Sequence, residues 1–150
     1  MKAASLYATL ALAFFLQVVV TSPAYACNNE TLKGPYAFTL RGTILTGPAA
    51  GIVDGVAMTT FDGAGGLRQV DAVSHNGSVA AVWRPGTGSY TINPDCTGSM
   101  SIDSPGSPTL NLAIVIGKSG RTIHTVVLND GFSITSDAER VRIPCPRAVR

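Results

Sequence analysis

Short runs in which apolar side chains occupy every second position follow one another along most of the chain. The first run spans residues 36–45 and places Tyr36, Phe38 and Leu40 on one face. This period of two is that of a β-strand with one buried and one solvated face. Further strands are predicted at residues 52–61, 67–74, 79–84, 90–92, 99–102, 110–116, 123–128 and 132–142. The pattern therefore predicts eight or nine strands.

Glycine-rich turn signals separate these runs. Asn76-Gly77 is the strongest, because both central residues of a type I′ hairpin turn need positive φ. Other turns are predicted at residues 47–48, 62–66, 85–88, 95–98, 105–106, 117–120 and 129–131. Ahead of the first strand, Asn28 or Asn29 is expected to cap a single helical turn that Pro35 ends. Turns at this spacing are typical of successive antiparallel hairpins.

An antiparallel sheet of this length has to protect its edge strands, and closure into a barrel removes them. We therefore predict an all-β fold, an antiparallel up-and-down barrel of about eight strands, with a two-sheet β-sandwich as the alternative. A barrel of this size is wide enough to be filled by side chains or to hold one small ligand. No linker interrupts residues 27–150, so they are expected to form one domain.

Residues 1–26 have the composition of an export signal. A basic residue precedes an apolar run at residues 10–20, and Ala24-Tyr25-Ala26 has the small-x-small form of a cleavage site. The apolar run is short of the roughly 20 residues that a membrane-spanning helix needs. We expect a secreted or periplasmic protein without an integral membrane span after cleavage. A lipid anchor on Cys27 is the alternative, although the residues before it fit that signal poorly.

After removal of the signal, 124 of the 150 residues remain, with ten basic and nine acidic side chains among them. This balance argues against a strong electrostatic attraction to nucleic acid or to a membrane, since both need a clustered basic face, and we predict no nucleic-acid partner. Four arginines do gather near the C-terminus: Arg140, Arg142, Arg147 and Arg150. We interpret them as a solvated chain end.

Export would place the three cysteines where disulfides persist. Cys27, Cys96 and Cys145 allow three pairings, and their positions alone do not choose among them. If every predicted turn reverses the chain, Cys96 and Cys145 lie at the same end of the molecule, opposite the start of the first strand. The segment that follows Cys27 is, however, long enough to cross the end of a small barrel. A bridge from Cys27 to Cys96 would stabilise the fold by about 4 kcal/mol.

No grouping of residues predicts a catalytic or metal centre. His75 and His124 stand without a neighbouring ligand, and Cys-x-x-Cys and Gly-x-Ser-x-Gly are absent. We therefore predict no metal and no cofactor and assign no catalytic residue. Asp54 and Asp71 are unusual because they fall inside predicted strands, where a buried carboxylate must be paired or hydrogen-bonded.

The strand at residues 67–74 provides a candidate ligand site. Gln69 and Asp71 share one of its faces with apolar residues. If that face points inward, both side chains line a cavity with four further side chains nearby: Tyr36, Phe38, Met58 and Trp83. If it points outward, both are solvated, and this is the orientation that we expect.

Several segments together resemble a group of small exported bacterial proteins. They are Cys27 and residues 32–38, 61–65, 76–77 and 88–98, of which Asp95-Cys96-Thr97-Gly98 is the most specific. The resemblance implies a barrel similar to the allene oxide cyclase type. It favours a Cys27–Cys96 disulfide over Cys96–Cys145, since Cys145 lies outside the shared pattern. No catalytic residue matches those cyclases, so the resemblance implies no enzyme role.

These observations predict an exported, disulfide-containing β-barrel that binds a small apolar ligand. One alternative is a cofactor-independent cyclase or isomerase that uses Gln69 and Asp71 inside the barrel. Another is an envelope or surface interaction protein. Two structural features distinguish the ligand-binding barrel from the enzyme: which face of the strand at residues 67–74 points inward, and whether the barrel interior is filled by side chains or hollow.

Overall fold

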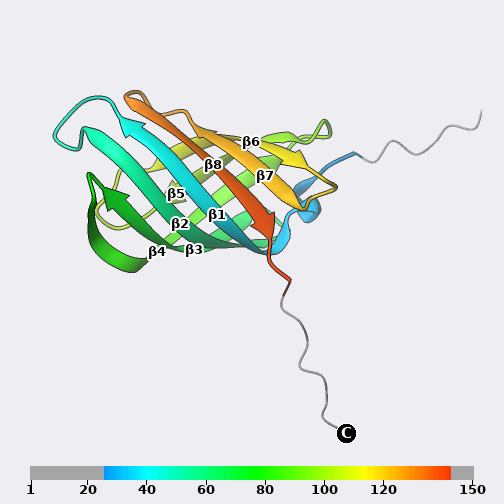
Figure 1. Ribbon diagram of the computed structural model, residues 1–150. Helices are drawn as coiled ribbons and strands as arrows, with labels where there is room; N and C mark the ends of the chain where they lie inside the picture. Colours follow the sequence, from blue (N-terminus) through cyan, green and yellow to red (C-terminus); the bar gives the residue numbers. More distant parts are fainter. Residues whose placement is uncertain (1–25, 143–150) are drawn as a thin grey trace, which may run out of the picture.

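The computed structural model describes residues 26–142 and shows a closed antiparallel barrel (Figure 1). Its eight strands are β1 (Lys33–Ile44), β2 (Gly51–Asp62), β3 (Gly66–His75), β4 (Ser78–Ile92), β5 (Thr97–Asp103), β6 (Leu110–Gly117), β7 (Thr122–Val127) and β8 (Phe132–Arg140). Each strand pairs with the next, and β8 pairs with β1. The predicted all-β barrel is confirmed. Most of the predicted export signal, together with Cys145, Arg147 and Arg150, lies outside the described residues.

The strand β4 joins two segments that the sequence pattern predicts as separate strands. It continues for 15 residues through the predicted turn at residues 85–88. The glycines there allow close approach of β5: a Cβ on Gly88 would lie 1.9 Å from the Ser101 carbonyl oxygen. The prediction of a turn at residues 85–88 was therefore wrong, and the strand count is eight.

This longer strand also changes the end at which Cys96 lies. Because residues 85–88 do not reverse the chain, Cys96 and the start of β1 are at the same end of the barrel, and the prediction of opposite ends was wrong. Cys27 and Cys96 form a disulfide with their Cα atoms 5.0 Å apart. This is the pairing that the resemblance favours. A Cys27 sulfur held in this bond is not available for a lipid anchor.

The end that carries the disulfide is covered and densely packed. A 3₁₀ turn, η1 (Asn29–Thr31), crosses it, and Leu32 is fully buried behind that turn. Three aromatic rings fill the barrel beneath: Tyr36, Phe61 and Tyr90, with neighbouring centroids 5.4 Å and 5.0 Å apart in edge-to-face contact. Burial raises the pKa of the Tyr36 and Tyr90 hydroxyls. At this end the barrel interior is therefore filled by side chains and closed to solvent.

The turn between β2 and β3 is stabilised by Asp62. Its Oδ1 accepts backbone N–H bonds from Ala64 at 2.7 Å, Gly66 at 2.9 Å and Gly65 at 3.0 Å. These bonds lower the pKa of the Asp62 carboxyl below its usual value of 3.8. A carboxyl whose pKa is lower in the folded state than in the unfolded state stabilises the protein at pH values above the unfolded-state pKa. This stabilisation is lost as the pH falls through the folded-state pKa.

We therefore expect Asp62→Ala to lower the free energy of unfolding near neutral pH, with a difference from wild type that shrinks below about pH 4. Urea unfolding at a series of pH values measures it. Asp130→Ala is the matched control, because the Asp130 side chain makes no hydrogen bond within residues 26–142. A difference that stays constant down to about pH 2 would contradict the role of the ionised carboxylate.

Candidate functional site

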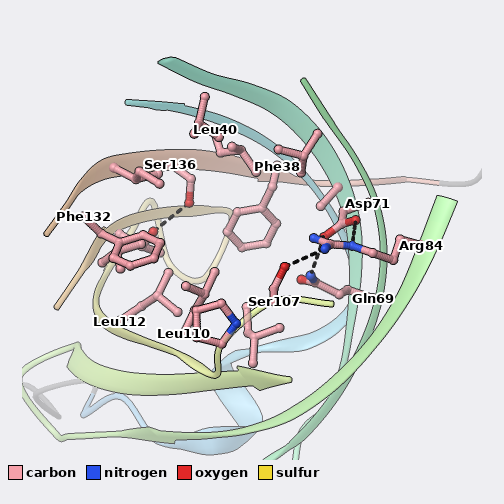
Figure 2. A pocket seen from close by; sticks show the side chains of 18 of the residues that line it. Phe38, Leu40, Gln69, Asp71, Arg84, Ser107, Leu110, Leu112, Phe132 and Ser136 are labelled. Carbon is pink, nitrogen blue, oxygen red and sulfur yellow. Dashed lines mark hydrogen bonds and ion pairs between the residues drawn. The ribbon is translucent and has the colours of Figure 1, made fainter. Parts of the chain in front are cut away.

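The half of the barrel away from the disulfide contains a cavity of about 360 Å³ (Figure 2). It reaches the surface between the connections at the open end, since exposed residues of the loop at 104–109 and the start of β4 belong to its wall. Ligand pockets in proteins have volumes of about 300–1,000 Å³. The interior is thus packed in the closed half and hollow in the open half.

Most of the cavity wall is apolar because the inward-facing positions of nearly every strand carry hydrocarbon side chains. They include Phe38, Leu40, Val53, Leu112, Phe132 and Ile134. The outward positions of the same strands are exposed, as the period-two pattern predicts. An apolar molecule in the cavity would therefore contact hydrocarbon side chains from most strands of the barrel.

One wall of the cavity is polar. Asp71 on β3 is 4% exposed, and its carboxylate accepts hydrogen bonds from Arg84 Nε and Nη2, both at 3.1 Å. Gln69 Nε2 donates to Asp71 Oδ2 at 3.3 Å, and Gln69 Oε1 accepts from the Thr59 hydroxyl at 3.3 Å. A bidentate guanidinium partner compensates the buried carboxylate, so this wall carries no net charge.

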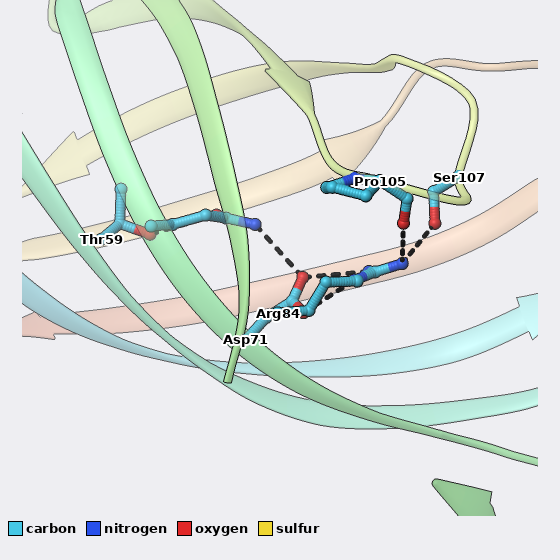
Figure 3. Close-up of polar contacts among 6 residues, drawn as sticks. Thr59, Asp71, Arg84, Pro105 and Ser107 are labelled. Carbon is cyan, nitrogen blue, oxygen red and sulfur yellow. Dashed lines mark hydrogen bonds and ion pairs between the residues drawn. The ribbon is translucent and has the colours of Figure 1, made fainter. Parts of the chain in front are cut away.

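Arg84 also connects this wall to the loop between β5 and β6. Its Nη1 donates to Ser107 Oγ at 2.6 Å and to the Pro105 carbonyl oxygen at 3.3 Å (Figure 3). Ser107 is itself part of the cavity wall. Arg84 thereby binds the middle of the loop at 104–109 at the mouth of the cavity, and Asn129 Nδ2 donates to the Thr109 carbonyl oxygen at 3.0 Å at the end of the loop.

A second polar group lies on the other side of the cavity. Thr125 Oγ1 on β7 and Ser136 Oγ on β8 are 2.6 Å apart and both residues are buried. In an eight-stranded barrel β7 is four strands away from β3, so this hydroxyl pair is opposite Asp71 (Figure 2). Nearer the mouth, His75 Nε2 lies 2.8 Å from the Ala49 carbonyl oxygen and is positioned to donate to it.

Three of the six residues predicted at this site line the cavity: Phe38, Gln69 and Asp71. Gln69 and Asp71 face inward, so the expectation that they point outward was wrong; the partner that makes burial possible is Arg84. Tyr36 belongs to the closed-end core, where its hydroxyl donates to the Gly120 carbonyl. Met58 lies on the outer face, between the inward Ala57 and Thr59, and Trp83 is 59% exposed.

Arg84 was missed because the strand register around it is irregular. A regular hairpin about Asn76-Gly77 pairs His75 with Ser78 and would place Val82 opposite Asp71. Two register shifts between β3 and β4 bring Arg84 to that position instead. Such β-bulges add residues to one strand only, and the alternation of side chains does not reveal them.

In the described part of the chain, Asp71 is the one carboxylate in the cavity wall, and it is already paired with Arg84. Within residues 26–142 no group of three or more His, Cys, Asp and Glu side chains could hold a metal ion. The Asp71 oxygens are occupied by Arg84 and Gln69, so Asp71 would have to leave the guanidinium before accepting a proton from a substrate. The site is better suited to binding than to proton transfer.

Comparison of the chain with protein-family models, curated proteins and solved structures gave no match in any of the three. The similarity to barrels of the allene oxide cyclase type therefore stays a prediction from the sequence. Among the residues that the structure describes, no helix is long and apolar enough to cross a bilayer.

Proposed function

We propose that the barrel binds one small, largely apolar molecule in its open half. The observation that carries this proposal is the cavity of about 360 Å³, with apolar walls and polar groups on two opposite sides. Protein interiors are otherwise packed to the density of organic crystals, and empty volume costs stability. A void of this size in a small domain is therefore best explained by a molecule that occupies it.

The polar groups of the cavity indicate the kind of ligand. The Asp71 oxygens are already used, whereas Gln69 Nε2 and Arg84 each keep an N–H group beyond the bonds described above. In the Thr125 and Ser136 pair, whichever hydroxyl accepts still has its own hydrogen to donate. An uncharged ligand with a carbonyl or ether oxygen would satisfy such donors without disturbing the neutral Asp71–Arg84 pair.

A cavity-filling variant tests this proposal. Ala57 faces the cavity beside Phe38, and Ala57→Phe would place a ring in the empty volume. We expect wild-type protein to bind the neutral apolar dye N-phenyl-1-naphthylamine with enhanced fluorescence, and Ala57→Phe to weaken that binding at least about tenfold, which corresponds to 1.4 kcal/mol. Native mass spectrometry of protein purified from its own source would show the natural ligand as added mass.

The matched control is Ala37→Phe, which adds the same ring on the exposed outer face of β1. Thermal unfolding of both variants verifies that each is folded. Equal dye binding by the two variants, with both folded, would place the dye outside the barrel and remove the support for a ligand carrier.

A cofactor-independent cyclase or isomerase is the second candidate function. It is favoured by the inward orientation of Gln69 and Asp71, which such chemistry requires. Once a ligand is identified, Asp71→Asn separates the candidates: an enzyme would keep binding but lose conversion of the ligand. Unchanged conversion by a folded Asp71→Asn protein would exclude Asp71 as the base.

We further propose that the protein is exported. The Cys27–Cys96 disulfide supports this, because such bonds persist in oxidising compartments. The mature chain would begin at Cys27, which intact-mass measurement of the natural protein would show directly.

A further inference from the structure

Several large apolar side chains are exposed at the open end of the barrel, next to the residues that line the cavity. This apolar rim consists of Leu45, Ile52, Val79, Val82, Trp83 and Leu128. Val82 is 64% exposed and Trp83 is 59% exposed, although both are neighbours of the half-buried Arg84. The rim residues come from the turn after β1, from β2 and β4, and from the turn before β8, so they lie along three of the four open-end connections rather than on one wall. Exposed apolar side chains that gather at one end of a domain indicate a surface that contacts a partner.

The bulges in β4 produce the most exposed part of this rim. In a regular strand Val82 and Trp83 would point to opposite faces. The register shift between Asp71 and Ala72 places an extra residue in β4, and Trp83 adopts a φ of 59° there. Left-handed backbone is unfavourable for a bulky residue and is found mainly where function requires it. The bulge thereby leaves the adjacent apolar side chains of Val82 and Trp83 both exposed to solvent.

The charge distribution differs sharply between the two ends of the barrel. The open-end connections at residues 45–50, 76–77, 104–109 and 128–131, together with residues 78–83 of β4, contain one charged residue, Asp130, and the exposed Asp103 lies beside them at the end of β5. The closed end carries many more: Glu30, Lys33, Asp62, Asp95, Lys118, Arg121, Glu139 and Arg140. A face that offers apolar side chains and almost no charge matches a hydrocarbon surface better than a charged partner.

We propose that the apolar rim docks on the surface of a lipid bilayer, with the cavity mouth facing the lipid. A rigid protein partner needs a continuous complementary patch of about 800 Å² on each side, whereas the rim is interrupted by the opening itself. A fluid bilayer accommodates such a ring, and tryptophan is enriched at the membrane–water interface. The inference goes beyond ligand binding, because it gives an apolar ligand a route between membrane and cavity that avoids water.

The chain contains a single tryptophan, so its fluorescence reports on the rim directly. With vesicles of phosphatidylcholine, we expect the Trp83 emission to shift to shorter wavelength and the protein to sediment with the lipid. Val79→Ser/Val82→Ser removes two rim side chains and should weaken the partition at least about tenfold. Phosphatidylglycerol should not strengthen binding, and salt should not weaken it, because the rim has no basic residue.

The matched control is Val56→Ser/Val115→Ser, two exposed valines on the side walls of the barrel, which should leave the partition unchanged. Three results would overturn the proposal: no vesicle binding, equal weakening by both double variants, or binding that needs anionic lipid and disappears in salt. A fourth contrary result would come from sedimentation without lipid. If the wild type were a dimer there, and Val79→Ser/Val82→Ser but not the control dissociated it, the rim would bind a second copy of the chain instead of a bilayer. None of these readouts depends on a bound ligand, so the ligand-carrier proposal is tested separately by the dye.

Discussion

Replacing Cys27 and Cys96 together by serine is expected to lower the free energy of unfolding by about 4 kcal/mol. The two cysteines are 69 residues apart in sequence, so their bond removes a long loop from the unfolded ensemble. In the folded state it fixes the segment ahead of η1 to the turn before β5, where the Cys27 N–H also donates to the Pro94 carbonyl at 3.1 Å. A small domain has only about 5–15 kcal/mol of stability in total.

Urea unfolding without reductant measures this difference. Dithiothreitol should destabilise the wild-type protein by a similar amount and leave the double serine variant unchanged, which separates the disulfide from other effects of the substitution. The disulfide is at the closed end, so the folded variant should bind N-phenyl-1-naphthylamine as the wild type does. A double variant as stable as oxidised wild type would show that the bond contributes nothing to the fold.

The strands could be predicted because their signal is local. A period of two along one segment identifies a strand whatever its neighbours are, and the predicted segment at 110–116 differs from β6 by one residue. The turn at residues 85–88 failed because glycine has two uses. It permits positive φ in turns and it permits close approach between backbones, and only the position of Ser101 on β5 shows that Gly88 serves the second use.

The candidate site was harder to predict for a related reason. Alternation places Gln69 and Asp71 on one face, but it does not say which face is inside when both mix polar and apolar residues. The decisive information is the cross-strand partner. Two bulges bring Arg84 opposite Asp71, and Ser107 reaches Arg84 only because the loop at 104–109 folds over the mouth. These contacts depend on register and loop position, which one sequence does not contain.

Replacing Arg84 by methionine is expected to lower the free energy of unfolding by about 3 kcal/mol, because it leaves the Asp71 carboxylate buried without a counter-charge. The lower part of the range for buried pairs applies, since the Arg84 side chain is 25% exposed. Asp71→Leu/Arg84→Met should cost less than Arg84→Met alone, as both charges then leave the cavity wall. Urea unfolding of the wild type, the two single variants and the double variant completes the cycle.

Arg84→Met should also loosen the loop at 104–109, because the guanidinium binds it at Ser107 and Pro105, while Asn129 continues to hold Thr109. We expect faster hydrogen exchange of the loop amides and faster entry of N-phenyl-1-naphthylamine, which stopped-flow fluorescence measures. Arg41→Met is the control: Arg41 is exposed on the outer face of β1, and a surface substitution of this kind changes stability by no more than about 0.5 kcal/mol. If Arg84→Met were no more destabilising than Arg41→Met and left dye entry unchanged, the ion pair would neither stabilise the cavity wall nor hold its mouth.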